Sequence, residues 1–143
     1  MYLVFVILVI LDQATKAIFA DRGFSFLDYD FHPTNNHALP FGLNFGGLWN
    51  FIILAFITVA VSWFISRLPE SGKWNYFGKS VFFAGVASNL VDRIMFGYVR
   101  DFIDLSLGFI FNLADVFIVL GLIIILFTTS SPKTKSDTTP TTV

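Results

Sequence analysis

Apolar positions are concentrated in four stretches, separated by shorter polar segments. They cover residues 2–20, 48–66, 80–98 and 111–128. Each stretch is close to the ~20 residues that a membrane-crossing α-helix needs. The pattern therefore predicts a mainly α, polytopic membrane protein, with four transmembrane helices in one domain over residues 1–130.

The polar segments differ in character. Residues 22–47 combine Gly, Pro and Asn with aromatic positions, which is typical of short strands and turns. We expect a small sheet there, resting on the membrane surface. Residues 67–79 and 99–111 are predicted to be loops on opposite sides of the membrane. Residues 131–143, rich in Ser, Thr, Pro and Lys, are predicted to form a disordered cytoplasmic tail.

Basic residues outside the apolar stretches set the expected orientation. They gather in the 67–79 segment and the tail, at Arg67, Lys73, Lys79, Lys133 and Lys135. Loops rich in Lys and Arg stay in the cytoplasm. Both termini are therefore expected inside the cell, and segments 22–47 and 99–111 outside.

Composition removes several function classes. The chain is 55% hydrophobic with a net charge of −1, which gives no reason to expect a nucleic-acid partner. It contains no cysteine, so disulfides, thiolate metal sites and a cysteine nucleophile are excluded. His32 and His37 have no carboxylate beside them at metal-ligand spacing, so we expect no metal site.

Polar residues recur at one predicted depth of the membrane, near its outer face. Asp12 and Lys16 are four residues apart near the end of the first helix. Gly85, Ser88, Asn89 and Asp92 share one face of the third helix, and Asn112 and Asp115 share a face at the start of the fourth. A charge in the membrane centre costs roughly 2.5–3.5 kcal/mol. Three separate helices placing polar groups at one depth therefore indicate a functional site.

Simpler interpretations of the same residues stay open. Asn112 and Asp115 fit a helix cap, Asp92 and Arg93 an interfacial ion pair, and Asp12 and Lys16 a pair that extends towards the membrane surface.

Three function classes remain. Asp101 and Asp115 flank a short connection, and an aspartate pair sharing one proton can activate water. The HExxH and GxSxG motifs are absent, so a hydrolase would have to use carboxylates. A small transporter and a lipid-binding structural protein are the rival classes.

Five motifs in chain order resemble the lipoprotein signal peptidases (signal peptidase II). They are LDQATK at 11–16, NHALPFG at 36–42, GVASNLVDR at 85–93, GYVRDFID at 97–104 and FNLADVFIVLG at 111–121. Ala38 stands where the family usually has glycine. The Gly-x-Gly-Asp motif of presenilin-type proteases is absent.

The resemblance implies an aspartic endopeptidase of the bacterial cytoplasmic (inner) membrane. It would remove signal peptides from diacylglyceryl-modified prolipoproteins, cutting before the lipidated cysteine. No metal or organic cofactor is implied. Its partners would be these substrates and membrane lipids, and we expect a monomer. Segment 22–47 would be the family's small extracytoplasmic β-cradle, and segment 99–111 would contribute a flap over the site.

The resemblance also implies a role for each site residue. The catalytic dyad would be Asp101 and Asp115, and Asn89 and Asn112 would orient its two carboxylates. Asn36 and Arg93 would hold the substrate backbone. The residues that support the site would be Asp12, Lys16 and Asp92.

Overall fold

The computed structural model describes residues 2–19, 24–26, 29–37, 45–68, 72–105 and 108–129. In chain order the described elements are α1 (Tyr2–Ile18), β1 (Phe24–Phe26), β2 (Tyr29–Asn36), α2 (Gly47–Arg67), α3 (Lys73–Phe96), β3 (Val99–Asp104), β4 (Ile110–Phe111) and α4 (Leu113–Thr129). The prediction of a mainly helical protein with a small sheet is therefore confirmed. Ala38 and the predicted tail lie outside the described residues.

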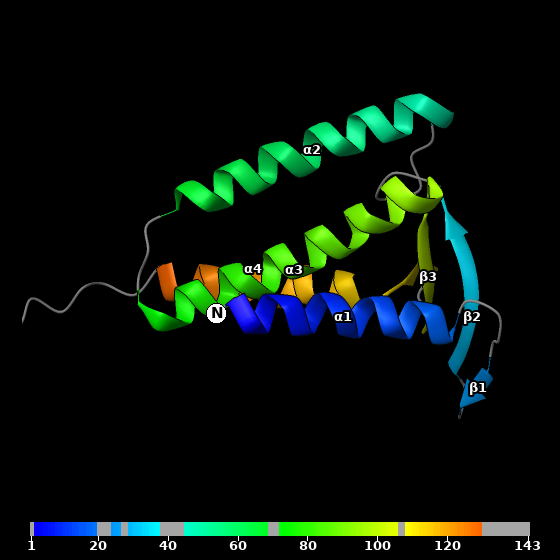
Figure 1. Cartoon of the computed structure of the whole chain (residues 1–143), viewed down its shortest axis with the longest axis horizontal. Coiled ribbons are helices and arrows are strands. Elements are labelled where there is room, and N and C mark those ends of the chain that lie inside the picture. The colour runs from blue at the N-terminus through cyan, green and yellow to red at the C-terminus, as the bar shows by residue number, and fades with distance from the viewer. Residues whose placement is uncertain are drawn as a thin grey trace, which may run out of the picture.

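The helix α3 is the centre of the bundle. It packs closely against α4 and α1, whereas α2 runs at a distance from the other three helices along much of its length (Figure 1). Two glycines allow α3 and α4 to approach. A Cβ on Gly85 would collide with the carbonyl oxygen of Ala114, and one on Gly121 would collide with the backbone of Phe82.

The sheet closes one end of the bundle (Figure 1). Its order is β1-β2-β3-β4 and all its pairs are antiparallel, with Thr34 opposite Asp101 and Asn36 opposite Val99. The described part of segment 99–111 was predicted to be a loop, and that prediction is wrong at β3 and β4. Pairing with β2 supplies hydrogen-bond partners that a local reading of this segment cannot reveal.

The third helix begins at Lys73 and not near residue 80. Its polar first turns have partners on neighbouring elements. Asn75 is fully buried and donates to the hydroxyls of Thr128 and Thr129 at 3.2 and 3.1 Å. Lys79 Nζ donates to the carbonyl of Leu68 at 2.9 Å. These contacts keep the polar turns helical.

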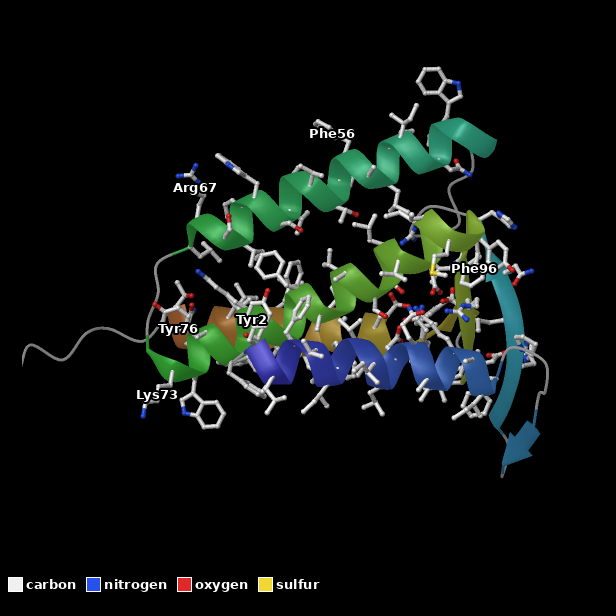
Figure 2. The ribbon with its side chains drawn as sticks, viewed as in Figure 1. Tyr2, Phe56, Arg67, Lys73, Tyr76 and Phe96 are labelled. Carbon is white, nitrogen blue, oxygen red and sulfur yellow. The ribbon has the colours of Figure 1, made fainter. Side chains whose placement is uncertain are left out.

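Large apolar side chains are exposed along the helices (Figure 2). On α2, Trp49 is 64% exposed, Phe56 73% and Trp63 60%. Within the described ranges, none of the helices combines the length and the apolar character needed to cross a membrane.

Candidate active site

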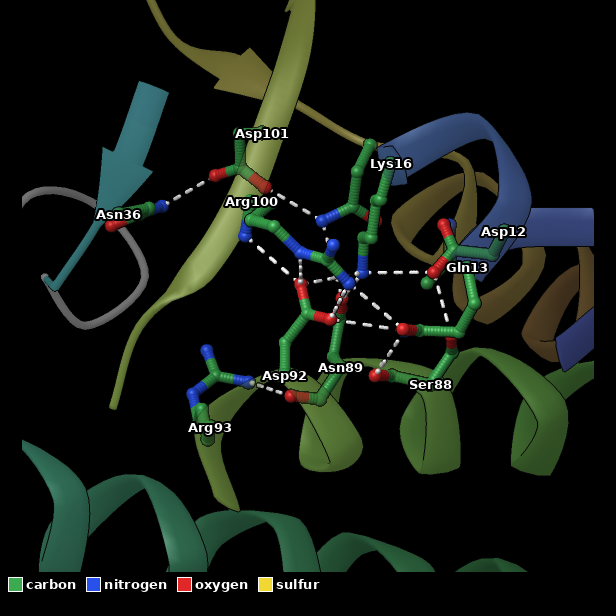
Figure 3. A network of polar contacts seen from close by, with 12 residues as sticks. Asp12, Gln13, Lys16, Asn36, Ser88, Asn89, Asp92, Arg93, Arg100 and Asp101 are labelled. Atoms are coloured by element: carbon green, nitrogen blue, oxygen red, sulfur yellow. Dashed lines mark hydrogen bonds and ion pairs between the residues drawn. The ribbon is translucent and has the colours of Figure 1, made fainter. Parts of the chain in front are cut away.

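The polar residues singled out in the sequence meet where the helices reach the sheet (Figure 3). The first helix contributes Asp12 and Lys16, α3 contributes Asn89 and Asp92, and β3 contributes Asp101. The start of α4 adds Asn112 and Asp115. Nearly all of these side chains are buried in the structure.

Asp101 is 2% exposed and both of its carboxylate oxygens accept hydrogen bonds. Asn36 Nδ2 donates to Oδ2 at 2.8 Å, and Asn112 Nδ2 donates to Oδ1 at 2.6 Å. Burial raises the pKa of Asp101 to about 6, although the two amide N–H bonds lower it, and the negative charge of Asp115 raises it further. Asp101 therefore holds a proton more readily than an exposed aspartate.

Asp115 lies in the first turn of α4. Asn89 Nδ2 donates to its Oδ1 at 2.8 Å, and the main-chain N–H of Asn112 donates to its Oδ2 at 3.2 Å. In return, the Asp115 N–H donates to Asn112 Oδ1 at 3.1 Å. This exchange is a reciprocal helix cap. The cap interpretation of the pair is therefore correct, and it coexists with the contact between Asn112 and Asp101.

The two carboxylates are joined through amides. Asn112 Nδ2 donates to Asp101 and also, at 3.1 Å, to Asn89 Oδ1, while Asn89 Nδ2 donates to Asp115. Lys16 Nζ donates to the same Asn89 oxygen at 2.9 Å. Because that oxygen faces two donors, the amide nitrogen of Asn89 must point to Asp115.

Lys16 does not extend to a surface, and that interpretation is wrong. The residue is 1% exposed, and its Nζ lies 2.8 Å from Asp12 Oδ2 and 3.3 Å from Asp92 Oδ2. Asp12 is equally buried and accepts from Ser88 Oγ at 2.6 Å and from the Ala114 N–H at 2.7 Å. The pair therefore fixes α1 against α3 and the start of α4.

Asp92 is paired with Arg100 and not with Arg93. The alternative interpretation of Asp92 and Arg93 as an interfacial ion pair is therefore wrong. Arg100 Nη2 lies 2.7 Å from Asp92 Oδ1. Gln13 joins the pair, with its Nε2 3.0 Å from Asp92 Oδ1. Sequence reasoning singled out neither Gln13 nor Arg100 as a site residue. Their positions next to Asp12 and Asp101 are the only signal that the sequence offers.

A cavity of about 160 Å³ opens beside Asp115, between α2, α3 and α4. Apolar side chains such as Leu54, Leu90 and Ile118 line most of it, and Asn89, Arg93 and Asp115 supply its polar part. Arg93 Nη1 donates to the Asn89 carbonyl at 3.4 Å, a long bond. The cavity suits an apolar group attached to a polar backbone.

No three His, Cys, Asp or Glu side chains in the described ranges are arranged to hold a metal ion. The arrangement as a whole offers two carboxylates linked through amides, one buried cation, Lys16, and an adjacent cavity. Two carboxylates sharing a proton are suited to general acid–base chemistry on a water molecule.

Comparisons with known proteins agree over most of the chain. Residues 4–130 match the family model described as signal peptidase (SPase) II. The chain is 35% identical to a lipoprotein signal peptidase of Microcystis aeruginosa, with 94% of each chain covered. It is 32% identical to one of Staphylococcus aureus, covering 93% of this chain and 91% of the relative.

Solved structures give the same match. A bacterial membrane enzyme superposes with a TM-score of 0.73 at 30% identity, covering 95% of this chain and 92% of the other. A second bacterial membrane enzyme gives a TM-score of 0.70, also at 30% identity, covering 88% and 89% of the two chains.

Proposed function

Since the chain belongs to the signal peptidase II family, we propose that it cuts diacylglyceryl-modified prolipoproteins before the lipidated cysteine, with Asp101 and Asp115 as the catalytic dyad. Family membership makes the chain a bacterial membrane enzyme and an aspartic endopeptidase. The finer assignment of residues and cleavage site is our proposal.

The observation that carries this proposal is the amide link between the two carboxylates. Asn112 contacts Asp101 through its side chain and Asp115 through its main chain, so both carboxylates are held against one residue. Two carboxylates that are held together cannot both be ionised easily. They therefore titrate as a coupled pair. The pair then carries one proton at the start of the reaction.

The reaction uses the pair as base and acid. The ionised carboxylate takes a proton from water, and the water oxygen attacks the carbonyl carbon of the scissile peptide. The protonated carboxylate gives its proton to the carbonyl oxygen, which becomes a hydroxyl group. Collapse of this intermediate breaks the C–N bond, while a proton passes from the dyad to the leaving amine.

The surroundings of the pair suit this chemistry. Lys16 and Arg93 place positive charge near the two carboxylates, which favours the ionised form that acts as the base. The cavity beside Asp115 would receive an apolar substrate group, with Asn36 and Arg93 binding the substrate backbone. Asn89 and Asn112 orient the carboxylates, and Asp12, Lys16 and Asp92 support them. No metal or organic cofactor takes part in this scheme.

We also propose that the four helices cross the cytoplasmic membrane of a bacterium, as a monomer in contact with membrane lipids. Arg67 and Lys73 lie at the end of the bundle remote from the sheet (Figure 2). The positive-inside rule then assigns that end and both termini to the cytoplasm, and the sheet and dyad to the outer face.

Since the chain has no cysteine, single introduced cysteines can test this topology. A maleimide that cannot cross the membrane should label His37→Cys in intact cells and should label Lys73→Cys only after the cells are opened. Labelling of both in intact cells would contradict the topology.

The enzymatic proposal is tested by incubating purified protein with a diacylglyceryl-modified prolipoprotein. Asp101→Asn and Asp115→Asn should each abolish cleavage while the circular dichroism spectrum stays that of the native protein. Asp104→Asn, on the same strand as Asp101 but outside the amide network, is the matched control and should cleave normally. Cleavage by a folded Asp101→Asn or Asp115→Asn variant would remove that residue from the dyad.

A further inference from the structure

We propose that Arg100 is a positioning residue for the reaction, which fixes strand β3 to α3 through Asp92 and thereby places Asp101 against Asn36 and Asn112. The inference rests on the proposed role of Asp101. Arg100 directly precedes Asp101 on β3, so an anchor at position 100 limits the motion of the next residue.

Arg100 is bound to Asp92 by both its backbone and its side chain. The Arg100 main-chain N–H donates to Asp92 Oδ2 at 3.0 Å, and Nη2 donates to Asp92 Oδ1 at 2.7 Å. A longer contact of 3.4 Å joins Nε to Oδ2. A two-point contact between guanidinium and carboxylate fixes direction as well as distance. Asp92 therefore fixes β3 in both position and orientation.

Gln13 completes the anchor from α1. Its Oε1 accepts from Arg100 Nη2 at 2.8 Å, and its Nε2 donates to Asp92 Oδ1 and to Ser88 Oγ at 3.0 and 2.9 Å. Figure 3 shows these contacts converging between α1, α3 and β3. Arg100 thus ties β3 both to α3, which precedes it in the chain, and to α1, which is 87 residues away at Gln13.

The charge balance explains why Arg100 stays in this position. Asp12 and Asp92 are fully buried carboxylates, and among the described residues their ion-pair partners are Lys16 and Arg100. A buried carboxylate without a cation is costly. The Arg100 guanidinium also lies over the Phe96 ring, with Cζ 4.5 Å from the centroid. These contacts hold its side chain in one place.

The alternative is that Arg100 only stabilises the fold. Positioning predicts an effect on chemistry per folded molecule, because a displacement of ~1 Å at a reacting group can cost about a hundredfold in rate. A loose β3 would also weaken the amide bonds that Asn36 and Asn112 make to Asp101. Loss of these bonds would raise the pKa of Asp101, since they favour its charged form.

The experiment compares Arg100→Ala, Arg100→Lys and the wild type in detergent micelles. The Asp101 carboxyl carbon is titrated by ¹³C NMR, and kcat and KM are measured on the lipidated prolipoprotein. Other charged groups around Asp101 are Asp115 on α4, Lys16 on α1 and Arg93 on α3, and all remain in each variant. Arg67→Ala changes an exposed arginine on α2 that is remote from the sheet, and it is the matched control.

We expect Arg100→Ala to lower kcat at least tenfold with KM within twofold, and to move the Asp101 titration to higher pH. Arg100→Lys should recover part of the kcat and part of the shift in the Asp101 titration. Arg67→Ala should change neither kcat nor the titration. If Arg100→Ala does not fold, Arg100→Gln replaces it, because the amide keeps much of the side-chain volume but loses the two-point contact.

An unchanged Asp101 titration in the folded variant would overturn the proposal, and so would a normal kcat per folded molecule. The proposed function has its own test: it would be contradicted if the wild type did not cleave the prolipoprotein, or if Asp101→Asn still cleaved it. The NMR titration would then still decide whether Arg100 positions Asp101.

Discussion

Asn112 Nδ2 donates to Asp101 Oδ1 at 2.6 Å, while the same residue caps α4 through its Oδ1 and its main-chain N–H. One side chain therefore joins the β3 carboxylate to the start of the helix that carries Asp115. The cap stabilises the helix, and the amide nitrogen holds the Asp101 carboxylate against the start of that helix. The two roles use different atoms, so they can be separated by mutation.

Asn112→Ser is predicted to keep the fold and lose most of the activity. Serine is a good N-cap residue and can still accept from the Asp115 N–H, but it is too short to reach Asp101. We expect the loss of its two buried amide hydrogen bonds to lower the unfolding free energy by about 1–3 kcal/mol, and kcat to fall at least a hundredfold. Denaturant titration and prolipoprotein cleavage measure the two effects.

Asn112→Ala is the matched variant that removes both roles. It should lose the same activity and a further ~1 kcal/mol of stability with the cap. If Asn112→Ser retained wild-type kcat, the bridge to Asp101 would have no part in catalysis.

The sequence predicted which residues form the site better than it predicted how they pair. Asp92 and Arg93 are neighbours in the chain, which suggested an ion pair. On a helix, consecutive side chains point ~100° apart, so adjacent residues do not face each other. The partner of Asp92 comes from β3, and only the tertiary structure brings Arg100 and Gln13 to it.

The boundaries of the helices and strands also depend on contacts that the local sequence does not reveal. Polarity predicted a loop over residues 67–79, yet α3 starts at Lys73, where oxygen atoms at the ends of α4 and α2 accept hydrogen bonds from Asn75 and Lys79. The hydropathy of a residue shows that it is polar, but it does not show that the folded chain provides a hydrogen-bond partner for it. The strand β3 was missed for a related reason, since its pairing with β2 spans more than sixty residues.

The raised pKa of Asp101 predicts that stability falls as pH rises from about 4 to 6. The pKa of this carboxyl is about 6 in the folded chain and 3.8 when unperturbed. Between these values the folded state binds more protons than the unfolded state, so raising the pH favours unfolding. A shift of ~2 pKa units corresponds to about 3 kcal/mol. Denaturant titration across this range measures the slope.

Asp101→Asn is the control for this slope, because its side chain does not titrate. The variant should lose much of the decrease in stability between pH 4 and 6. An identical slope in both proteins would assign the pH dependence to other carboxylates. In the wild type, kcat/KM should also fall as pH rises through about 6, because the proposed dyad would then lose its shared proton.

Close packing of α3 on α4 predicts a graded response to glycine replacement. In Gly85→Ala and Gly121→Ala, the new methyl group meets backbone atoms, of Ala114 and Phe82 respectively. In Gly78→Ala it meets mainly side-chain carbons of Ile124 and Ile125, at 2.8 to 3.1 Å, and side chains can shift. Overpacking typically costs ~1–3 kcal/mol. We expect the loss of unfolding free energy to lie near the upper end of this range for Gly85→Ala and Gly121→Ala, and near the lower end for Gly78→Ala.

Denaturant titration of the three alanine variants tests this order. Gly85→Ala should also reduce cleavage per folded molecule, because Ala114 precedes Asp115 and donates its N–H to Asp12. Equal stability losses at all three positions would contradict the distinction between backbone and side-chain contacts.

Arg93 is predicted to bind the substrate and not to take part in proton transfer. It lines the cavity beside Asp115, and its one hydrogen bond within the described part of the chain is the long contact to the Asn89 carbonyl. Its guanidinium therefore has N–H groups available for a substrate carbonyl. Hydrogen bonds to charged groups contribute ~1.5–3 kcal/mol, or about ten- to a hundredfold in binding.

Arg93→Ala should therefore raise KM on the lipidated prolipoprotein at least tenfold and change kcat less than threefold. Arg93→Lys keeps the charge and should recover part of the affinity, and Arg67→Ala serves as the control outside the cavity. A loss of an interaction present in both ground and transition states raises KM alone. If kcat fell with KM unchanged, Arg93 would instead stabilise the transition state. It would then assist the reaction at the proposed dyad and would not serve in substrate binding.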